Sequence, residues 1–502
     1  MRSDGNIQRI LIVGGGTAGW MAANYLNRFL RRTSCKICLL ESPNIGTVGV
    51  GEATIPAIVR FIRNMEFDEA EFMRRCHATY KLGIKFVDWV RQGHSYWHPF
   101  GVCGGIIDGQ DLFHFWLKSA RKNLGDGTYS SYSLQALLAD AARAPRSLEG
   151  SSQIIESGAY AYHLDADALA KYLREKAVGA GVEHIEDDVC DTLVDNDGFI
   201  ESVNTSGGRE LSADLYLDCT GFKAQLIERA LGDEYVDWSD LLLCDRAVVL
   251  PLPQDPQMLP YTRATALRAG WAWQIPLTHR TGCGYAYSSS HIDDDAAVTE
   301  LLEHSNLGGF LAEEPRRLEM RVGRRKNFWK GNCIALGLAS GFIEPLESTA
   351  IFFIQYAIEM LMDYFPDKMF PEHLATKYNR RMVDAFEQVR DFVLLHYKLS
   401  QREDTDFWRD SRGIAEPDSL RAVSELYADC GIVESTIFPQ TSYYHIFIGG
   451  EKLPRRTLPL ADSSDLSEVR KIMSSIKAKN REVVKSLPSH RAIIEWLNRP
   501  AL

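Results

Sequence analysis

The sequence predicts an α/β protein with a Rossmann-like body, a mixed-sheet region and a mainly helical C-terminal unit. The apolar stretch RILIVGG at residues 9–15 is followed by helical spacing over residues 18–30 and by a second apolar strand, KICLLE, at residues 36–41. This order is a β-α-β unit, the building block of parallel sheets. Helical patterns dominate from residue 348 onward, and 502 residues exceed one ordinary core.

The next stretches begin the mixed-sheet region. Residues 54–76 have helical spacing, and residues 80–89 alternate, with apolar side chains on one face and Lys81 and Lys85 on the other. Residues 93–131 are rich in glycine, histidine and aromatic residues, which predicts a loop-heavy insertion near a site.

The α/β pattern then continues. Residues 163–185 predict a capped helix followed by a strand, and residues 191–221 predict a hairpin that ends in a buried strand. Residues 263–288 predict two strands around Thr281-Gly282.

An apolar strand with a glycine turn is predicted at residues 331–342. We expect a body over residues 1–345, with an inserted region at about 80–130 and 240–290, and a helical unit over residues 346–502.

Composition excludes several classes of partner. The net charge of −11 leaves no clustered basic footprint for nucleic acid or an anionic membrane. No basic head with a long apolar stretch opens the chain, so no signal peptide is expected. The apolar segment at residues 351–365 carries a polar stripe of Gln355, Glu359 and Asp363, which predicts a buried helix rather than a membrane span.

The ten cysteines indicate neither a disulfide framework nor a metal site. They are scattered, and the one C-x-x-C pair, Cys35 and Cys38, falls in a predicted strand without a second pair to complete a zinc site. We expect reduced thiols in a cytoplasmic protein that binds no metal.

A glycine-rich loop predicts a dinucleotide site. Residues 14–19 fit G-x-G-x-x-G between a strand and a helix, and Glu41 ends the next strand. Glycines let backbone amides approach a pyrophosphate, the helix N-terminus favours its charge, and the acid can accept ribose hydroxyl hydrogens. The alternative is a glycine turn without a ligand. The motif does not separate FAD from NAD.

The stretch GFIEPLESTA, residues 341–350, predicts an anion site at a helix mouth. Pro345 directs the chain into an apolar helix, and Ser348 is the expected N-cap. The amides of Thr349 and Ala350 then have no intrahelical acceptor, and no capping box closes them. The alternative for Glu347 is a carboxylate that only interacts with the helix dipole.

Five stretches together resemble the flavin-dependent halogenases typified by the tryptophan halogenases. They are GGGTAGWMAA (14–23), VGVGEATIP (48–56), KLGIKF (81–86), GWAWQIP (270–276) and GFIEPLEST (341–349). In addition, DLYLDCTGF and GNCIALGLASGF resemble the paired glycine turns around the flavin in flavoprotein monooxygenases. The resemblance implies a flavoprotein monooxygenase-type body that binds FAD through Gly14, Gly16, Thr17, Ala18, Gly19, Glu41, Gly51, Glu52, Ala53, Val189 and Leu338.

The resemblance also implies an activity. Reduced FAD, supplied by a separate flavin reductase, and O2 would oxidise chloride or bromide held at Thr349 and Ala350. Hypohalous acid would then reach Lys81, which hydrogen-bonds it or carries it as a haloamine, and Glu347 would accept the proton of an aromatic substrate. The substrate and tunnel residues would be His98, Phe100, Trp271, Trp273, Ile275 and Pro276. A homodimer is compatible with the resemblance.

Without the resemblance, plainer readings stand. Lys81 would lie on the solvated face of an edge strand, GWAWQIP would be a half-buried aromatic strand, and His98 and Phe100 would be loop packing. Two departures from the family bear on specificity. Ala350 stands where glycine is frequent, and no Phe-Trp pair follows Tyr443 and Tyr444. Indole or another aromatic without an amino-acid head is therefore favoured over free tryptophan.

Two rival functions remain. An FAD-dependent aromatic hydroxylase would oxygenate its substrate directly, and such enzymes usually read G-D-A where this chain has Gly337-Leu338-Ala339. A non-catalytic flavin-binding protein of the same fold would be expected to lack Lys81 or Glu347. Both residues are present.

Overall fold

The structure, a computed structural model, describes residues 5–44, 46, 51–147, 159–305 and 314–499. The chain packs as two compact units, each made of three separated segments. The first unit comprises Met1–His77, Leu164–Asp240 and Met320–Glu387, and the second comprises Ala78–His163, Leu241–Glu319 and Gln388–Leu502. Both regions expected to be insertions lie in the second unit.

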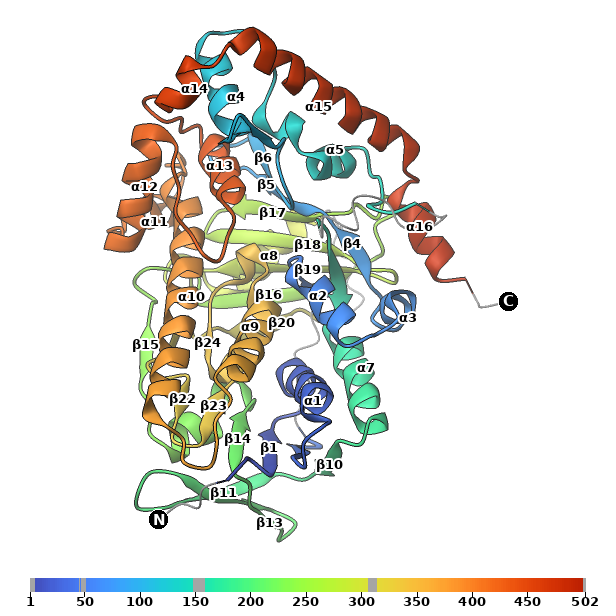
Figure 1. Cartoon of the computed structure of the whole chain (residues 1–502), viewed down its shortest axis with the longest axis vertical. Coiled ribbons are helices and arrows are strands. Elements are labelled where there is room, and N and C mark those ends of the chain that lie inside the picture. Colours follow the sequence, from blue (N-terminus) through green and yellow to red (C-terminus); the bar gives the residue numbers. More distant parts are fainter. Residues whose placement is uncertain (1–4, 45, 47–50, 148–158, 306–313, 500–502) are drawn as a thin grey trace. The chain divides into compact units, whose positions relative to one another are not determined.

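The first unit contains the predicted Rossmann-like sheet (Figure 1). Its strand order is β10-β2-β1-β14-β23-β22, and every neighbouring pair is parallel except β22 with β23. Helix α1 (Thr17–Leu30) follows β1, which confirms the β-α-β unit. The strands are β1 (Arg9–Val13), β2 (Lys36–Glu41), β10 (Glu183–Glu186), β14 (Leu215–Asp218), β22 (Trp329–Lys330) and β23 (Cys333–Ala335).

The first unit also confirms the capped helix and the hairpin. Asp165 caps α7 (Ala166–Gly179) by accepting the amide of Ala168, and α7 packs against α1. The hairpin is formed by β11 (Val189–Val194) and β12 (Ile200–Thr205), which continue to β13 (Glu210–Leu211) and then to β14. The core under β14 includes Val13, Leu40, Val203, Tyr216 and Cys333.

The second unit contains a seven-stranded mixed sheet of order β20-β16-β19-β18-β17-β5-β6. Its pairs are antiparallel except β17 with β5. The strands are β5 (Gly83–Val87), β6 (Ser95–Pro99), β16 (Arg246–Leu252), β17 (Thr262–Leu267), β18 (Gly270–Pro276), β19 (Thr281–Tyr287) and β20 (Arg316–Glu319).

Two strand predictions were wrong in detail. The alternating stretch at residues 80–89 forms two strands, because Leu82 leaves the ladder and donates its amide to the carbonyl of Pro260. The first of them, β4 (Thr79–Lys81), pairs with β9 (Ala161–Asp165) through residues 161–163 rather than with the sheet of β5. Residues 263–288 contribute three strands rather than two. Their last turn is closed by Leu277 donating to Arg280, ahead of Thr281-Gly282.

Helices account for the remaining elements. The predicted helical stretch at residues 54–76 forms two helices, α2 and α3, and helices dominate after residue 348 as expected. The boundary at residue 345 stays a prediction. Among the described residues no helix is long and apolar enough to cross a membrane. The helices are α2 (Ala57–Asn64), α3 (Glu69–Arg75), α4 (Leu112–Arg121), α5 (Leu134–Asp140), α8 (Asp294–His304), α9 (Ala350–Asp363), α10 (Glu372–Lys398), α11 (Asp406–Gly413), α12 (Asp418–Cys430), α13 (Gln440–Gly449), α14 (Pro459–Ser463), α15 (Leu466–Ser486) and α16 (His490–Leu497).

One buried lysine ties the C-terminal helices to the rest of the second unit. Lys118 on α4 is 6% exposed, and its Nζ donates to the carbonyls of Ala461, Asp462 and Ser464 at 3.0, 2.7 and 3.1 Å. These carbonyls lie at the end of the short helix α14, where helix carbonyls lack intrahelical donors. Helix α15, which follows, packs along α4 and α5 (Figure 1).

Replacing Lys118 by methionine should keep most of the side-chain volume and leave these carbonyls unsatisfied. We expect the free energy of unfolding to fall by about 2–3 kcal/mol in urea titrations, the usual cost of stranding buried polar groups. Amide exchange should also quicken at residues 459–466. The exposed Lys122→Met serves as a control, and equal losses in the two variants would contradict the assignment.

Candidate active site

The glycine loop is shaped by close backbone contacts in the first unit. Gly14 has φ +114°, and a Cβ there would lie 2.2 Å from the carbonyl oxygen of Cys219. A Cβ on Gly19 would lie 1.9 Å from the carbonyl oxygen of Gly14. Larger residues would therefore separate the end of β1 from β14 and from α1.

The space in front of the loop fits a pyrophosphate. Gly16 is the N-cap of α1, whose first residues are Thr17 and Ala18, and a Cβ on Gly16 would meet nothing within 4 Å. The unpaired amides of the first helical turn point to this end of the helix and favour negative charge there. The residues present therefore fit the dinucleotide predicted from the motif.

Glu41 ends β2 beside the loop, as the motif requires. Its Oε1 lies 2.8 Å from Nε2 of His184 and 3.7 Å from Arg174, and its Oε2 lies against Gly15. Glu41, His184 and Glu186 also bring potential metal-ligand atoms within 4.8 Å of one another. Since the His184 ring already pairs with Glu41, this group is better suited to holding the carboxylate in place for a ribose.

The second glycine turn packs directly against the first. Gly337 has φ +61°, and a Cβ there would lie 2.8 Å from Cβ of Ala18 and 3.8 Å from Cγ1 of Ile354 on α9. The turn Gly337–Ala339, which contains Leu338, therefore contacts the starts of both α1 and α9. Thus the structure brings Ala18 and the Leu338 turn together in the first unit, and their binding of FAD stays a prediction.

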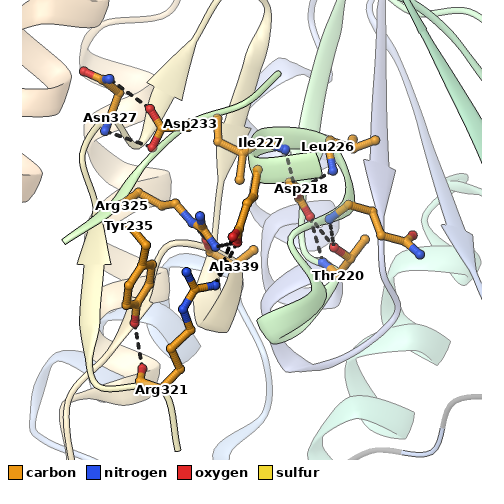
Figure 2. Close-up of polar contacts among 12 residues, drawn as sticks. Asp218, Thr220, Leu226, Ile227, Asp233, Tyr235, Arg321, Arg325, Asn327 and Ala339 are labelled. Atoms are coloured by element: carbon orange, nitrogen blue, oxygen red, sulfur yellow. Dashed lines mark hydrogen bonds and ion pairs between the residues drawn. The ribbon is translucent and has the colours of Figure 1, made fainter. Parts of the chain in front are cut away.

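Two buried charged residues, which sequence reasoning did not assign, hold the turn after β14 and the Gly337–Ala339 turn (Figure 2). Asp218, 0% exposed, accepts hydrogen bonds from the amides of Thr220, Leu226 and Ile227. Arg325, 1% exposed, donates its Nε to the carbonyl of Ala339 at 3.0 Å and pairs with Glu228.

The signal for Asp218 was present in DLYLDCTGF, where an acid follows an apolar strand. Arg325 carries no local signal, because its partners are distant in sequence.

The remaining cofactor residues lie in β3 and β11 of the first unit. Gly51, Glu52 and Ala53 form β3 (Gly51–Ala53), while residues 48–50 of the VGVGEATIP stretch lie outside the described residues. Burial raises the pKa of the Glu52 carboxyl to about 7. Val189 begins β11, two residues after Asp187, whose amide donates to the carbonyl of Glu41.

The helix mouth differs in one respect from the prediction. Ser348 is not the N-cap, because its backbone is left-handed (φ 59°, ψ 39°) and it ends the short turn Pro345–Glu347. Thr349 is the N-cap of α9, and within the described part of the chain its side chain caps no amide. A left-handed residue followed by a right-handed one turns successive amides toward a common point, which is an anion-binding nest. This backbone is compatible with an anion at the amides of Thr349 and Ala350, which stays a prediction. Glu347 beside them is 1% exposed.

Lys81 lies in a wholly buried position of the second unit. It is 0% exposed, and its Nζ lies 5.2 Å from the ring centroid of Phe100. The solvated-strand alternative is excluded for Lys81, although it partly describes Lys85, which is 26% exposed and pairs with Asp140. His163 lies near Lys81. Burial, helped by the charge of Lys81, holds the pKa of the His163 ring well below its usual value.

Every residue of the tryptophan strand except Gln274, which is partly exposed, is buried. Trp271, Trp273 and Ile275 alternate on β18, which ends at Pro276 as predicted. The two indole centroids are 5.7 Å apart, and the ring of Trp273 lies across Gly284, where a Cβ would approach it to 2.2 Å. The half-buried alternative is therefore excluded.

His98 belongs to an aromatic cluster of the second unit. It is 3% exposed on β6, and its ring centroid lies 5.6 Å from that of Phe392. The ring centroid of Tyr443 on α13 lies 4.7 Å from that of Phe392. Burial, aided by His98, lowers the pKa of His445 to about 3, so this ring is neutral at physiological pH.

The predicted site residues thus form two groups. The cofactor residues, Glu347, Thr349 and Ala350 belong to the first unit, and Lys81, the aromatic residues and Pro276 belong to the second.

The chain is similar to known proteins over nearly its whole length. A family model for tryptophan halogenase matches residues 9–465. The tryptophan 6-halogenase SttH of Streptomyces toxytricini is 38% identical over 96% of this chain and 97% of its own length. The tryptophan 7-halogenase RebH of Lentzea aerocolonigenes is 36% identical over 97% and 98%. The structure of Xcc4156, a flavin-dependent halogenase from Xanthomonas campestris, superposes with a TM-score of 0.93 at 39% identity, covering 99% of this chain and 100% of that one. The chain therefore belongs to the tryptophan halogenase family and is a flavin-dependent halogenase.

Proposed function

We propose that this enzyme uses reduced FAD and O2 to place chloride or bromide on an indole-type substrate that lacks an amino-acid head. A separate flavin reductase supplies the reduced FAD. The observation that carries the proposal is the wholly buried Lys81, held over the ring of Phe100 in a chain of this family. An amine removed from water beside an aromatic ring is suited to binding an electrophilic halogen.

The residues of the first unit support FAD as the dinucleotide. Gly14, Gly16 and the first turn of α1 would hold the pyrophosphate, Glu41 the ribose, and the Leu338 turn the flavin side. When bound, reduced FAD supplies with O2 the oxidising equivalent that converts halide to hypohalous acid. The amides of Thr349 and Ala350 would hold the halide as an anion in the nest at the mouth of α9.

Lys81 and Glu347 divide the substitution between them. Hypohalous acid bound to the Lys81 amine, or carried on it as a haloamine, delivers halogen as a cation to a ring carbon. The ring carbon forms a bond to halogen and then loses its proton to the carboxylate of Glu347. With free hypohalous acid the second product is water, and with the haloamine the amine is released.

The charged groups after α13 support a substrate without an amino-acid head. Glu451 pairs with Arg91 at 2.7 Å and is 40% exposed, and Arg456 pairs with Asp429 at the surface. Both Glu451 and Arg456 are exposed and already paired with neighbouring side chains. That cluster offers ring faces and edges, which suit an indole.

Gly16→Ala should separate cofactor binding from folding. Its methyl group meets no protein atom within 4 Å and no strained backbone is required, so we expect the melting temperature of the FAD-free protein to change little. The methyl group would occupy the space proposed for the pyrophosphate, so FAD affinity measured by fluorescence quenching should fall at least tenfold. Gly14→Ala is the contrasting variant, since it should lower stability as well. Unchanged FAD affinity in Gly16→Ala would contradict the assigned site.

Substrate choice can be tested directly. The enzyme is incubated with FAD, a flavin reductase, NADH and bromide or chloride, with indole and tryptophan offered in parallel. We expect mass spectrometry to detect monohalogenated indole at a rate at least tenfold above that of halogenated tryptophan. A hydroxylated product would favour the aromatic hydroxylase instead, and preferred halogenation of tryptophan would reject the proposed substrate class.

Lys81→Ala and Glu347→Gln should test the two proposed catalytic residues. Halogenation should become undetectable without the amine and fall about 10²- to 10⁴-fold without the carboxylate, the usual contribution of a positioned general base. FAD affinity should stay at the wild-type value in both. Lys85→Ala, which removes the partly exposed amine of the same sequence stretch, is the matched control and should keep activity. Full activity in Lys81→Ala would refute its role.

A further inference from the structure

Three buried side chains join the strand that carries Lys81 to the end of the tryptophan strand. Oγ1 of Thr79 lies 2.6 Å from the carbonyl oxygen of Pro276, and Nδ1 of His163 lies 3.2 Å from the same Oγ1. Nε2 of His163 lies 2.9 Å from Oγ1 of Thr262. All three side chains are 5% exposed or less and belong to the second unit.

Counting protons fixes the direction of each hydrogen bond. The carbonyl of Pro276 can only accept, so the single hydroxyl proton of Thr79 is donated there. Thr79 Oγ1 must then accept from the Nδ1–H of His163. Burial, helped by the charge of Lys81, holds the pKa of His163 well below its usual value, so the ring is neutral and Nε2 is the acceptor. Thr262 donates to that nitrogen. The three hydrogen bonds therefore run in one direction, from Thr262 through His163 and Thr79 to the carbonyl of Pro276.

A second neutral histidine holds the next residue of the same strand. The amide of Tyr80 donates to Nε2 of His490 at 3.0 Å, so the ring proton is on Nδ1, which donates to the carbonyl of Met258. Burial lowers the pKa of His490 to about 4. The two residues that precede Lys81 are therefore anchored, one by its side chain and one by its backbone.

We propose that Thr79 and His163 are positioning residues that hold Lys81 in register with the end of the W-x-W-x-I-P strand. The inference rests on the proposed role of Lys81 as the halogen-carrying residue. The β4 strand is only three residues long and is paired with β9, so its own ladder fixes it weakly. Thr79, two residues before Lys81, links β4 to Pro276, and His163 links it through Thr262 to β17.

If this link is lost, we expect hypohalous acid to be formed as before but to escape into solution instead of reacting with the substrate. Hypohalous acid that meets a displaced amine leaves the site unused, because small misplacements of reacting groups are costly. A purely structural role would lower stability without changing how oxidised halide is divided between substrate and solvent.

The experiment compares Thr79→Val with Thr79→Ser in bromide, with indole as substrate and a soluble β-diketone as a trap for hypobromous acid. Valine keeps the shape and removes the hydroxyl, whereas serine keeps the hydroxyl. We expect the ratio of brominated indole to brominated trap to fall about tenfold in Thr79→Val, as for loss of one buried hydrogen bond, and to stay within about twofold of wild type in Thr79→Ser. FAD affinity should not change.

Thr281→Val is the matched control. Thr281 is 5% exposed, pairs with Pro276 across β18 and β19, and accepts the amide of Asp255, but it makes no bond to β4. Its ratio should equal that of wild type even if its stability falls. Equal ratios in Thr79→Val and wild type, or equal decreases in Thr79→Val and Thr281→Val, would overturn the inference.

If Thr79→Val does not fold, Thr262→Val replaces it, because it removes the donor to His163 from a different strand. A decrease of about threefold in the ratio is expected there, and an unchanged ratio would overturn the inference. Failure of the proposed function is recognised separately, since the wild-type enzyme would then form no brominated indole at all.

Discussion

The central feature of the second unit is a lysine, Lys81, that is wholly buried from solvent. Taking an ammonium group out of water costs free energy unless the surroundings compensate for it. Lys81 is wholly buried over the face of Phe100, and the nearby ring of His163 is kept neutral by burial and by the lysine's own charge. An aromatic face and a neutral ring add no second positive charge. The amine is thus held away from solvent beside an aromatic face, as its proposed role requires.

The turns of the first unit depend on glycines, which have no side chain. Gly14, Gly19 and Gly337 each bring backbone or a small side chain closer than any Cβ would allow. These contacts draw the ends of β1 and β14, the start of α1 and the second turn to one place. Buried charged groups then hold two of the turns: Asp218 accepts the amides of Leu226 and Ile227 after β14, and Arg325 donates to the carbonyl of Ala339.

Several features could be predicted because they are local. The β-α-β unit, the glycine loop, Glu41 at the end of β2, and Trp271 and Trp273 on one strand all follow from periodicity and motif, and the structure confirms them. The predicted N-cap of α9, Ser348, was wrong by one residue, because the N-cap is Thr349. Propensity favours serine as a cap, but Ser348 takes a left-handed backbone to end the turn that begins at Pro345.

Other features could not be predicted because their partners are distant in sequence. Residues 80–89 alternate like one strand, yet Leu82 breaks it by donating to the carbonyl of Pro260. The alternation correctly placed the apolar side chains of this stretch on a buried face. It could not reveal that the side chain of Lys81 is also buried while that of Lys85 remains partly exposed.

The sequence by itself determined the family and the glycine loop and supplied the candidate reactive side chains, since these depend on residue type and short spacing. Only the tertiary structure decided which groups surround them. Thr79, His163 and Thr262 come from three strands separated by up to 183 residues, and nothing in their neighbours marks them. Hydrogen bonds between such residues form only after the strands have packed, because packing removes the competing water and brings the donors to their acceptors.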